Sequence, residues 1–63
     1  GGSMEGITGN LIEGDTIYVA NAKVDTIRGG HITLGPNAEV RCVEYTQEIK
    51  VSETAIVKDI IKL

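Results

Sequence analysis

Three segments of the chain repeat one pattern of apolar residues, and this repeat constrains the fold more than any other feature. The segments are IYVANAKVDTI (17–27), ITLGPNAEVRCV (32–43) and IKVSETAIVKDI (49–60), aligned with a one-residue gap in the first. Equivalent apolar residues recur at steps of 15 to 17 residues. They form five columns: Ile17, Ile32 and Ile49; Val19, Leu34 and Val51; Ala22, Ala38 and Ala55; Val24, Val40 and Val57; and Ile27, Val43 and Ile60. A repeat of this length predicts a stack of similar structural units.

Each repeat has the pattern of short strands joined by corners. The two apolar residues that open a repeat are separated by one residue, which is the alternation of a strand with one buried face. Corners are expected at Asn21, at Pro36 and Asn37, and at Glu53 and Thr54. The β-branched residues Ile, Val and Thr make up 21 of the 63 residues, a composition that favours strands.

A coil of about 16 residues cannot bury its own apolar side, but stacked coils bury a continuous column and pair their backbones. We therefore predict an all-β chain that forms a β-solenoid of about three to four coils. Residues 5–63 are expected to form this single domain, after a cloning remnant, GGSM, at 1–4. Leu11 lies six residues before Ile17, the same spacing as Val43 to Ile49, and is expected to begin the partial first coil.

The last segment has an alternative interpretation as a helix. Residues 52–63 would begin with Ser52 as the N-cap and would place Ile56, Ile60 and Leu63 on one face. Periodicity alone cannot separate a short strand from a short helix. Alignment with the other two repeats favours a coil, and both structures stay open for 52–63.

Composition excludes several classes of function. The net charge is −3 and the basic residues do not cluster, so we expect no nucleic-acid partner. No long apolar run is present, so we expect no integral membrane segment and a cytoplasmic location. Cys42 is the single cysteine and His31 the single histidine, too few ligands for a zinc site. We expect no metal and no cofactor.

The individual candidate residues indicate no catalytic site. His31 follows two glycines at a corner with no nucleophile beside it, and Cys42 is expected to be a small residue near a corner. Tyr18 and Tyr45 are the only aromatic residues and could contact a partner. The acids are expected to form a solvated outer face with Arg41, Lys50 and Lys58 available for pairing between coils; they are Glu39, Glu44, Glu48 and Glu53.

Association with another copy is the remaining way in which the fold of this chain could gain additional stability. A 63-residue domain buries little surface, and disulfides and metals are already excluded. The last coil has no neighbour of its own above it, so a two-fold, tail-to-tail contact is expected there. The first coil is the other open end. The expected self-association residues are Ile49, Val51, Val57, Ile60, Ile61 and Leu63 at the C-terminal end, and Leu11 and Ile17 at the N-terminal end.

The segment IRGGHITLGPNAEVRCVEYTQEIKVSETAIVKDIIKL (27–63) resembles the C-terminal part of a bactofilin, a polymer-forming cytoskeletal protein of bacteria. The resemblance implies a right-handed parallel β-helix and assembly end to end into filaments without a bound nucleotide. It also implies a scaffold role in cell shape or the envelope, where an envelope-associated protein could be a second partner. This chain has fewer coils than that family usually carries, as expected either of a fragment or of a short member of the family.

Two other function classes stay open. A binding module would use the flat side of the solenoid, with Tyr18 or Tyr45 exposed and the chain monomeric. An acyltransferase-like β-helix enzyme, with His31 as its base, is the least expected class, because the chain lacks a strict hexapeptide repeat.

Overall fold

The computed structural model describes residues 2–5 and 8–63, with side chains from residue 11 onward. Five strands form one parallel sheet in sequence order. They are β1 Gly2–Glu5, β2 Thr8–Ala20, β3 Lys23–Leu34, β4 Glu39–Val51 and β5 Ile56–Lys62. This part of the chain has no helix long and apolar enough to cross a membrane. The predicted all-β fold is confirmed.

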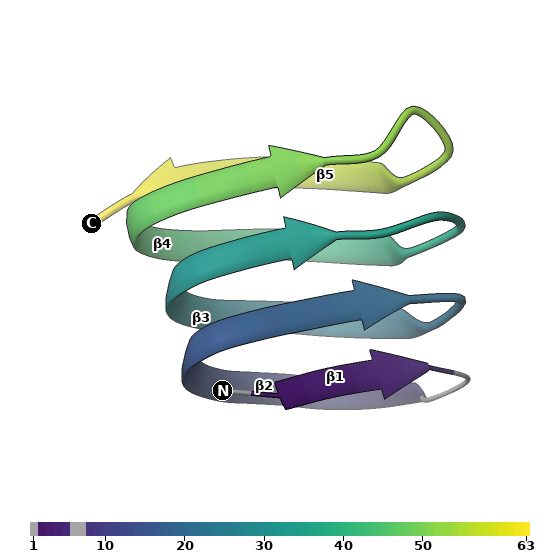
Figure 1. Cartoon of the computed structure of the whole chain (residues 1–63), viewed down its shortest axis with the longest axis horizontal. Coiled ribbons are helices and arrows are strands. Elements are labelled where there is room, and N and C mark those ends of the chain that lie inside the picture. The colour runs from purple at the N-terminus through teal and green to yellow at the C-terminus, as the bar shows by residue number, and fades with distance from the viewer. Residues whose placement is uncertain (1, 6–7) are drawn as a thin grey trace.

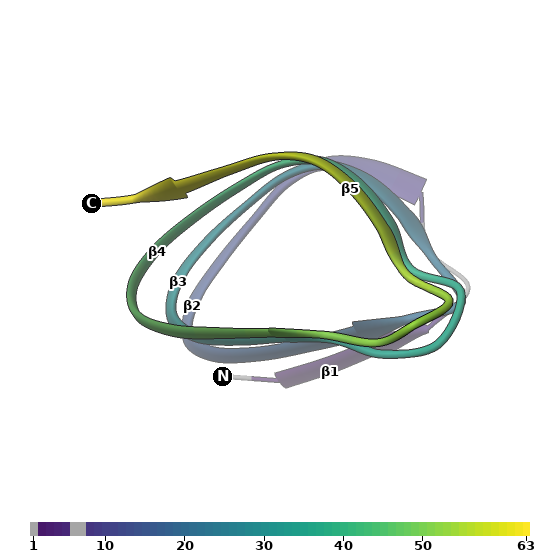
Figure 2. The same cartoon turned by 90° about the horizontal axis from the view of Figure 1, so that it is seen from above.

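The strands wind into a right-handed parallel β-helix. In Figure 1 the near strands run from left to right, the chain returns behind them, and each coil lies above the one before it. Seen from above in Figure 2, the successive coils nearly superpose and enclose a common interior. Each long strand bends through one side of the outline, on the left in Figure 1, and turns close the other side. The predicted right-handed β-solenoid is confirmed.

The strand register reproduces four of the five columns that the repeat predicts, and the alanines of the fifth column lie in the turns, outside the paired strands. Residue pairs such as Ile17 with Ile32, and Ile32 with Ile49, lie directly opposite one another in neighbouring coils. Parallel pairing in this register places like apolar side chains above one another, which fills the interior without aromatic rings. The buried core consists of Ile17, Val19, Ala22, Val24, Ile27, Ile32, Leu34, Ala38, Val40 and Val43.

The predicted column position of Leu11 is wrong by one residue. Ile12, not Leu11, pairs with Ile27, and Leu11 is 49% exposed beside Thr26. The cause is a register shift at the bend of β4, where Gly29 pairs with Tyr45 but the next pair is His31 with Glu48. The six-residue spacing from Val43 to Ile49, from which the position of Leu11 was predicted, therefore reflects the extra residue in the bend of β4.

The first coil is not the open end that was expected around Ile17. Ile17 is only 3% exposed, and its backbone pairs with Gly2 on one side and with Ile32 on the other. Ile17 therefore belongs to the core of a single chain, and its side chain is not exposed for the self-association that the sequence predicted. The sequence prediction begins the domain at residue 5, whereas Gly2–Glu5 forms strand β1 in the structure. A parallel ladder is formed by backbone groups, so an apolar pattern is not needed to continue it.

The segment 52–63 forms a turn and a strand, and the helical alternative is wrong. Residues 53 and 54 form the turn, and β5 follows from Ile56. The Ser52 amide donates to the Leu34 carbonyl, the Ile56 amide to Ala38, and the Leu63 amide to Tyr45. The neighbouring coil thus satisfies backbone groups that a helix would have bonded internally.

Asn21 and Asn37 lie in the turns that follow β2 and β3. Asn21 and Asn37 both adopt left-handed backbone conformations, with φ of 51° and 62°. The Asn37 amide nitrogen of the side chain donates to the Asn21 side-chain oxygen at 3.1 Å, and the Asn37 backbone amide donates to the Thr54 hydroxyl at 3.2 Å. Asparagine tolerates the left-handed region better than other residues with a Cβ, so these corners form with little strain.

Replacing Asn37 with valine is expected to lower stability by about 1–2 kcal/mol, because a β-branched residue is disfavoured at positive φ. The amide contact with Asn21 is lost as well. Asn37→Gly removes the same contact but accepts the backbone angle, so it serves as the matched control. Urea unfolding of the two variants measures the difference, and equal losses would contradict a backbone origin.

Candidate self-association surface at the C-terminal end

Among the side chains of residues 11–63, the large exposed apolar ones lie mainly at the last coil. Ile60 is 46% exposed, whereas Val43, its equivalent one coil earlier, is fully buried. Val51 is 43% exposed above the fully buried Leu34. The large exposed apolar residues at this end are Val51, Ile56, Ile60, Ile61 and Leu63. Among the predicted residues here, Ile49 and Val57 are half-buried and pack against the core. The six C-terminal residues predicted for self-association therefore occupy one end of the solenoid.

Strand β5 is apolar on its outer side too. Ile56 is in register with Glu39, which follows Lys23 in the same outward column. Ile61 is in register with Glu44, where earlier coils carry charged residues. Ile56 is 63% exposed and Ile61 is 45% exposed. Strands with apolar side chains on both sides are typical of parallel sheets covered on both faces, which here predicts contact beyond the end of the stack.

The charged column beneath Ile61 is an ion-pair ladder across three coils. Arg28 Nε donates to Glu44 Oε1 at 2.6 Å, and its Nη1 donates to Glu13 Oε2 at 3.3 Å. The hydrogen bond to Glu44 raises the pKa of the Arg28 guanidinium further above its ordinary value. The sequence prediction missed Arg28, although Glu13, Arg28 and Glu44 follow the coil spacing. The ladder ends where Ile61 replaces a charged residue.

Two further pairs of polar side chains connect neighbouring coils. Arg41 Nε lies 3.8 Å from Asp25 Oδ1, and His31 Nδ1 lies 3.8 Å from Glu48 Oε1. Pairing between coils through Arg41 is therefore confirmed, with Asp25 as its partner. No ion pair within the described residues includes Lys58 or Asp59 of β5.

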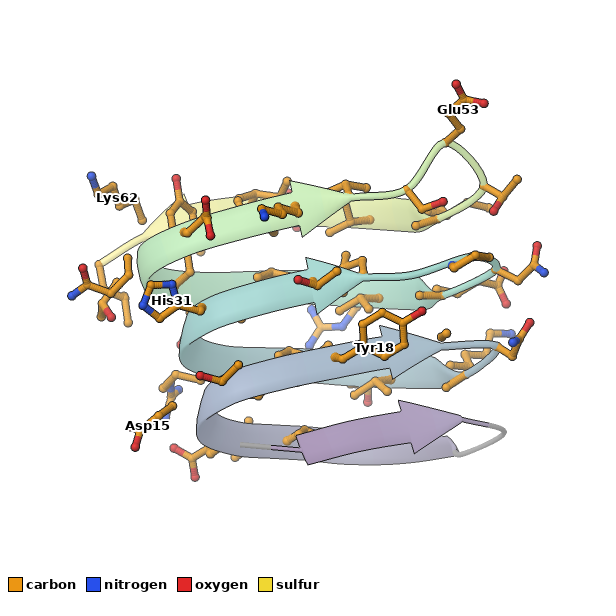
Figure 3. All side chains as sticks on the ribbon, in the orientation of Figure 1. Asp15, Tyr18, His31, Glu53 and Lys62 are labelled. Atoms are coloured by element: carbon orange, nitrogen blue, oxygen red, sulfur yellow. The ribbon has the colours of Figure 1, made fainter. Side chains whose placement is uncertain are left out.

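The other sequence candidates lie apart from one another. Figure 3 shows Tyr18 on the near face and His31 by the bend. Tyr18 is partly buried over Gly35, whereas Tyr45 packs against the core from the bend of β4. Cys42 is a free, partly buried thiol in register with Thr26 and Asp59. The two tyrosines do not share a patch. Within residues 2–5 and 8–63, no cluster of three or more His, Cys, Asp or Glu side chains could hold a metal ion.

An open groove of about 340 Å³ runs along the bend side of the coils. Gly14, Gly29 and Gly30 line it, together with Glu13 and Arg28, whose side chains already pair with each other. Leu63 of the exposed apolar end also lines the groove.

Comparison with known proteins gives one informative match. YhbE of Bacillus subtilis (strain 168), an uncharacterized protein, is 37% identical to this chain over 57 residues. The match covers 90% of this chain and 24% of YhbE, so the chain spans about a quarter of the relative's length. No family model matches the chain, and no solved structure matches it. The similarity to YhbE therefore extends over nearly all of the solenoid described above.

Proposed function

We propose that this chain is a subunit of a self-assembling cytoplasmic scaffold and that copies associate through the C-terminal end of the solenoid. The observation that carries the proposal is the exposed apolar end: Val51 and Ile60 continue core columns whose earlier members are fully buried. The unpaired backbone edge of β5 adds hydrogen-bonding groups that another strand can satisfy. A second copy offers both the apolar columns and the strand edge.

The two ends of the stack differ, and the difference favours contact between like ends. The backbone register places Gly2 in the column of Ile17 and Gly9 in the column of Val24. A head-to-tail stack that continued these columns would set Ile49 against Gly2 and leave the volume of a large side chain unfilled. A tail-to-tail contact brings branched apolar residues together from both copies, and one surface satisfies both chains.

The resemblance to bactofilins supports a scaffold as the purpose of this association. The right-handed β-helix is the fold that the resemblance implies, and an assembly without nucleotide suits the lack of a nucleotide-binding motif in the sequence. The free Cys42 thiol suits a reducing cytoplasm. A tail contact alone produces pairs, so filaments require a second contact, for which exposed Leu11 marks a place near the other end.

Changing both Ile61 and Leu63 to lysine is expected to dissociate the assembly, because four added charges then lie at the seam of a two-fold pair. Association and folding are coupled, so the double variant should also melt at a lower temperature. Sedimentation velocity at matched concentrations measures the change. Asp15→Asn with Thr16→Lys is the control, since it adds the same net charge at two exposed residues of β2, away from the C-terminal end.

The control pair should sediment like the unaltered chain. A double variant at Ile61 and Leu63 with unchanged mass would remove the C-terminal seam from the account. Electron microscopy of the unaltered chain then separates the larger assemblies: ordered filaments support the bactofilin-like scaffold, and discrete pairs support association through the tails alone. A monomer at all concentrations would contradict the proposal and favour a binding module.

A further inference from the structure

The exposed strand β5 has a sequence that is complementary to itself when reversed. Residues 56–61 read IVKDII, so an antiparallel copy sets isoleucine opposite isoleucine, valine opposite isoleucine and lysine opposite aspartate. We propose that two copies pair through β5 in this one register, about a two-fold axis between Lys58 and Asp59. The proposal rests on the self-association proposed above and adds its partner strand, register and charge contacts.

The faces of β5 agree with this register. Val57 and Ile60 continue the buried columns of Val40 and Val43, so both point toward the interior. In the proposed pair, Val57 lies opposite Ile60 of the second copy, and the two cores meet across the seam. Ile56 and Ile61 both replace charged residues of the outer columns, and they too lie opposite each other. Directly opposed residues of antiparallel strands share a face, as these pairs require.

Strand β5 changes direction between Val57 and Ile60, where the proposed two-fold axis passes. Two interior residues separated by three positions cannot both face inward on a straight strand, so the strand turns between Val57 and Ile60. The same turn is visible in the preceding coil, where Val40 and Val43 are both buried. A two-fold axis between Lys58 and Asp59 superimposes each strand's bend on that of its partner. Both straight halves of β5 can then follow the partner strand.

Charge selects this register over its neighbours. Lys58 lies beside Arg41 in the stack, because the residues flanking both are paired, and Asp59 lies opposite Cys42. Neither charge has an ion-pair partner within the described residues. In the proposed register Lys58 of each copy faces Asp59 of the other, twice per pair. A shift by one residue either way sets Lys58 against Lys58 or Asp59 against Asp59, which is repulsive.

Charge reversal tests the register directly. In Lys58→Asp the introduced carboxylate of each copy faces the partner's Asp59, and in Asp59→Lys the introduced ammonium group faces the partner's Lys58. Each single variant should therefore self-associate about tenfold more weakly or worse than the unaltered chain. An equimolar mixture of the two variants restores opposite charges at both contacts and should associate again. The double variant Lys58→Asp with Asp59→Lys should associate on its own.

Sedimentation equilibrium of each variant, of the mixture and of the double variant provides the readout. Lys23→Asp, at an exposed residue on β3, changes the net charge by the same amount as Lys58→Asp and should associate like the unaltered chain. Recovery in the mixture also shows that each single variant is folded. If the unaltered chain associates but the single variants do so equally well, or the mixture does not recover, the register is overturned while the proposed function stands. If the unaltered chain stays monomeric, both fail.

Discussion

Val40→Asp is expected to unfold the chain. Val40 is buried and lies between Val24 and Val57 in the stacked column, so a carboxylate there has neither water nor a partner. Burial of an unpaired charge costs several kcal/mol, which is comparable to the whole stability of roughly 3–9 kcal/mol for a chain of this size. Circular dichroism should show loss of the strand signal and of the cooperative thermal transition.

Gln47→Asp is the matched control for Val40→Asp. It adds the same charge to the same strand at an exposed position and should melt cooperatively near the unaltered chain. A cooperative transition at an unchanged temperature in Val40→Asp would show that this column is not a dry interior.

Gly29→Ala is expected to destabilise the bend side of the solenoid. A Cβ on Gly29 would lie 2.5 Å from the backbone carbonyl oxygen of Gly14 and 3.0 Å from Ile17 Cδ1. The backbone carbonyl cannot move without disturbing the ladder, because Gly14 and Gly29 pair directly. Overpacking of this kind costs about 1–3 kcal/mol. For a domain of this size each kcal/mol lowers the melting temperature by roughly 4–8 °C.

Gly30→Ala provides the comparison within the same bend. Its Cβ would lie 3.0 Å from the Asp15 carbonyl oxygen, with side-chain atoms of Gln47 and Thr46 farther away at 3.6 Å. The added methyl is therefore less crowded, and the melting temperature should fall less than in Gly29→Ala. Differential scanning calorimetry of both variants measures the order. The reverse order would contradict the stacking of Gly14 on Gly29.

Much of the interior was predictable from the sequence because stacking makes it periodic. Residues such as Ile32 and Val40 align with their neighbours by spacing alone, and the register places them as that spacing predicts. Spacing failed for Leu11 because the bend of β4 holds one more residue than the bend of β3. An insertion in an exposed bend changes the count without changing the apolar pattern, so the pattern cannot reveal it.

The ends of the stack were harder to predict than its interior. Strand β1 carries no apolar repeat that would mark it as a coil, and it joins the sheet through backbone pairing with Ile17–Ala20. The exposure of Val51 and Ile60 agrees with the last positions that the repeat assigns them in their columns. The apolar outer side of β5 was not predictable from the sequence. The outward position of Ile56 and Ile61 follows only from their pairing with Glu39 and Glu44. The self-complementary register of β5 depends on knowing both faces.

Sedimentation equilibrium of the unaltered chain across a wide range of concentrations tests self-association through the C-terminal end most directly. One chain has a mass of 6.7 kDa. We expect the weight-average mass to rise with concentration from this value to at least twice it, with the melting temperature rising in parallel because association stabilises the folded chain. A mass of 6.7 kDa at every concentration, with a constant melting temperature, would contradict the account.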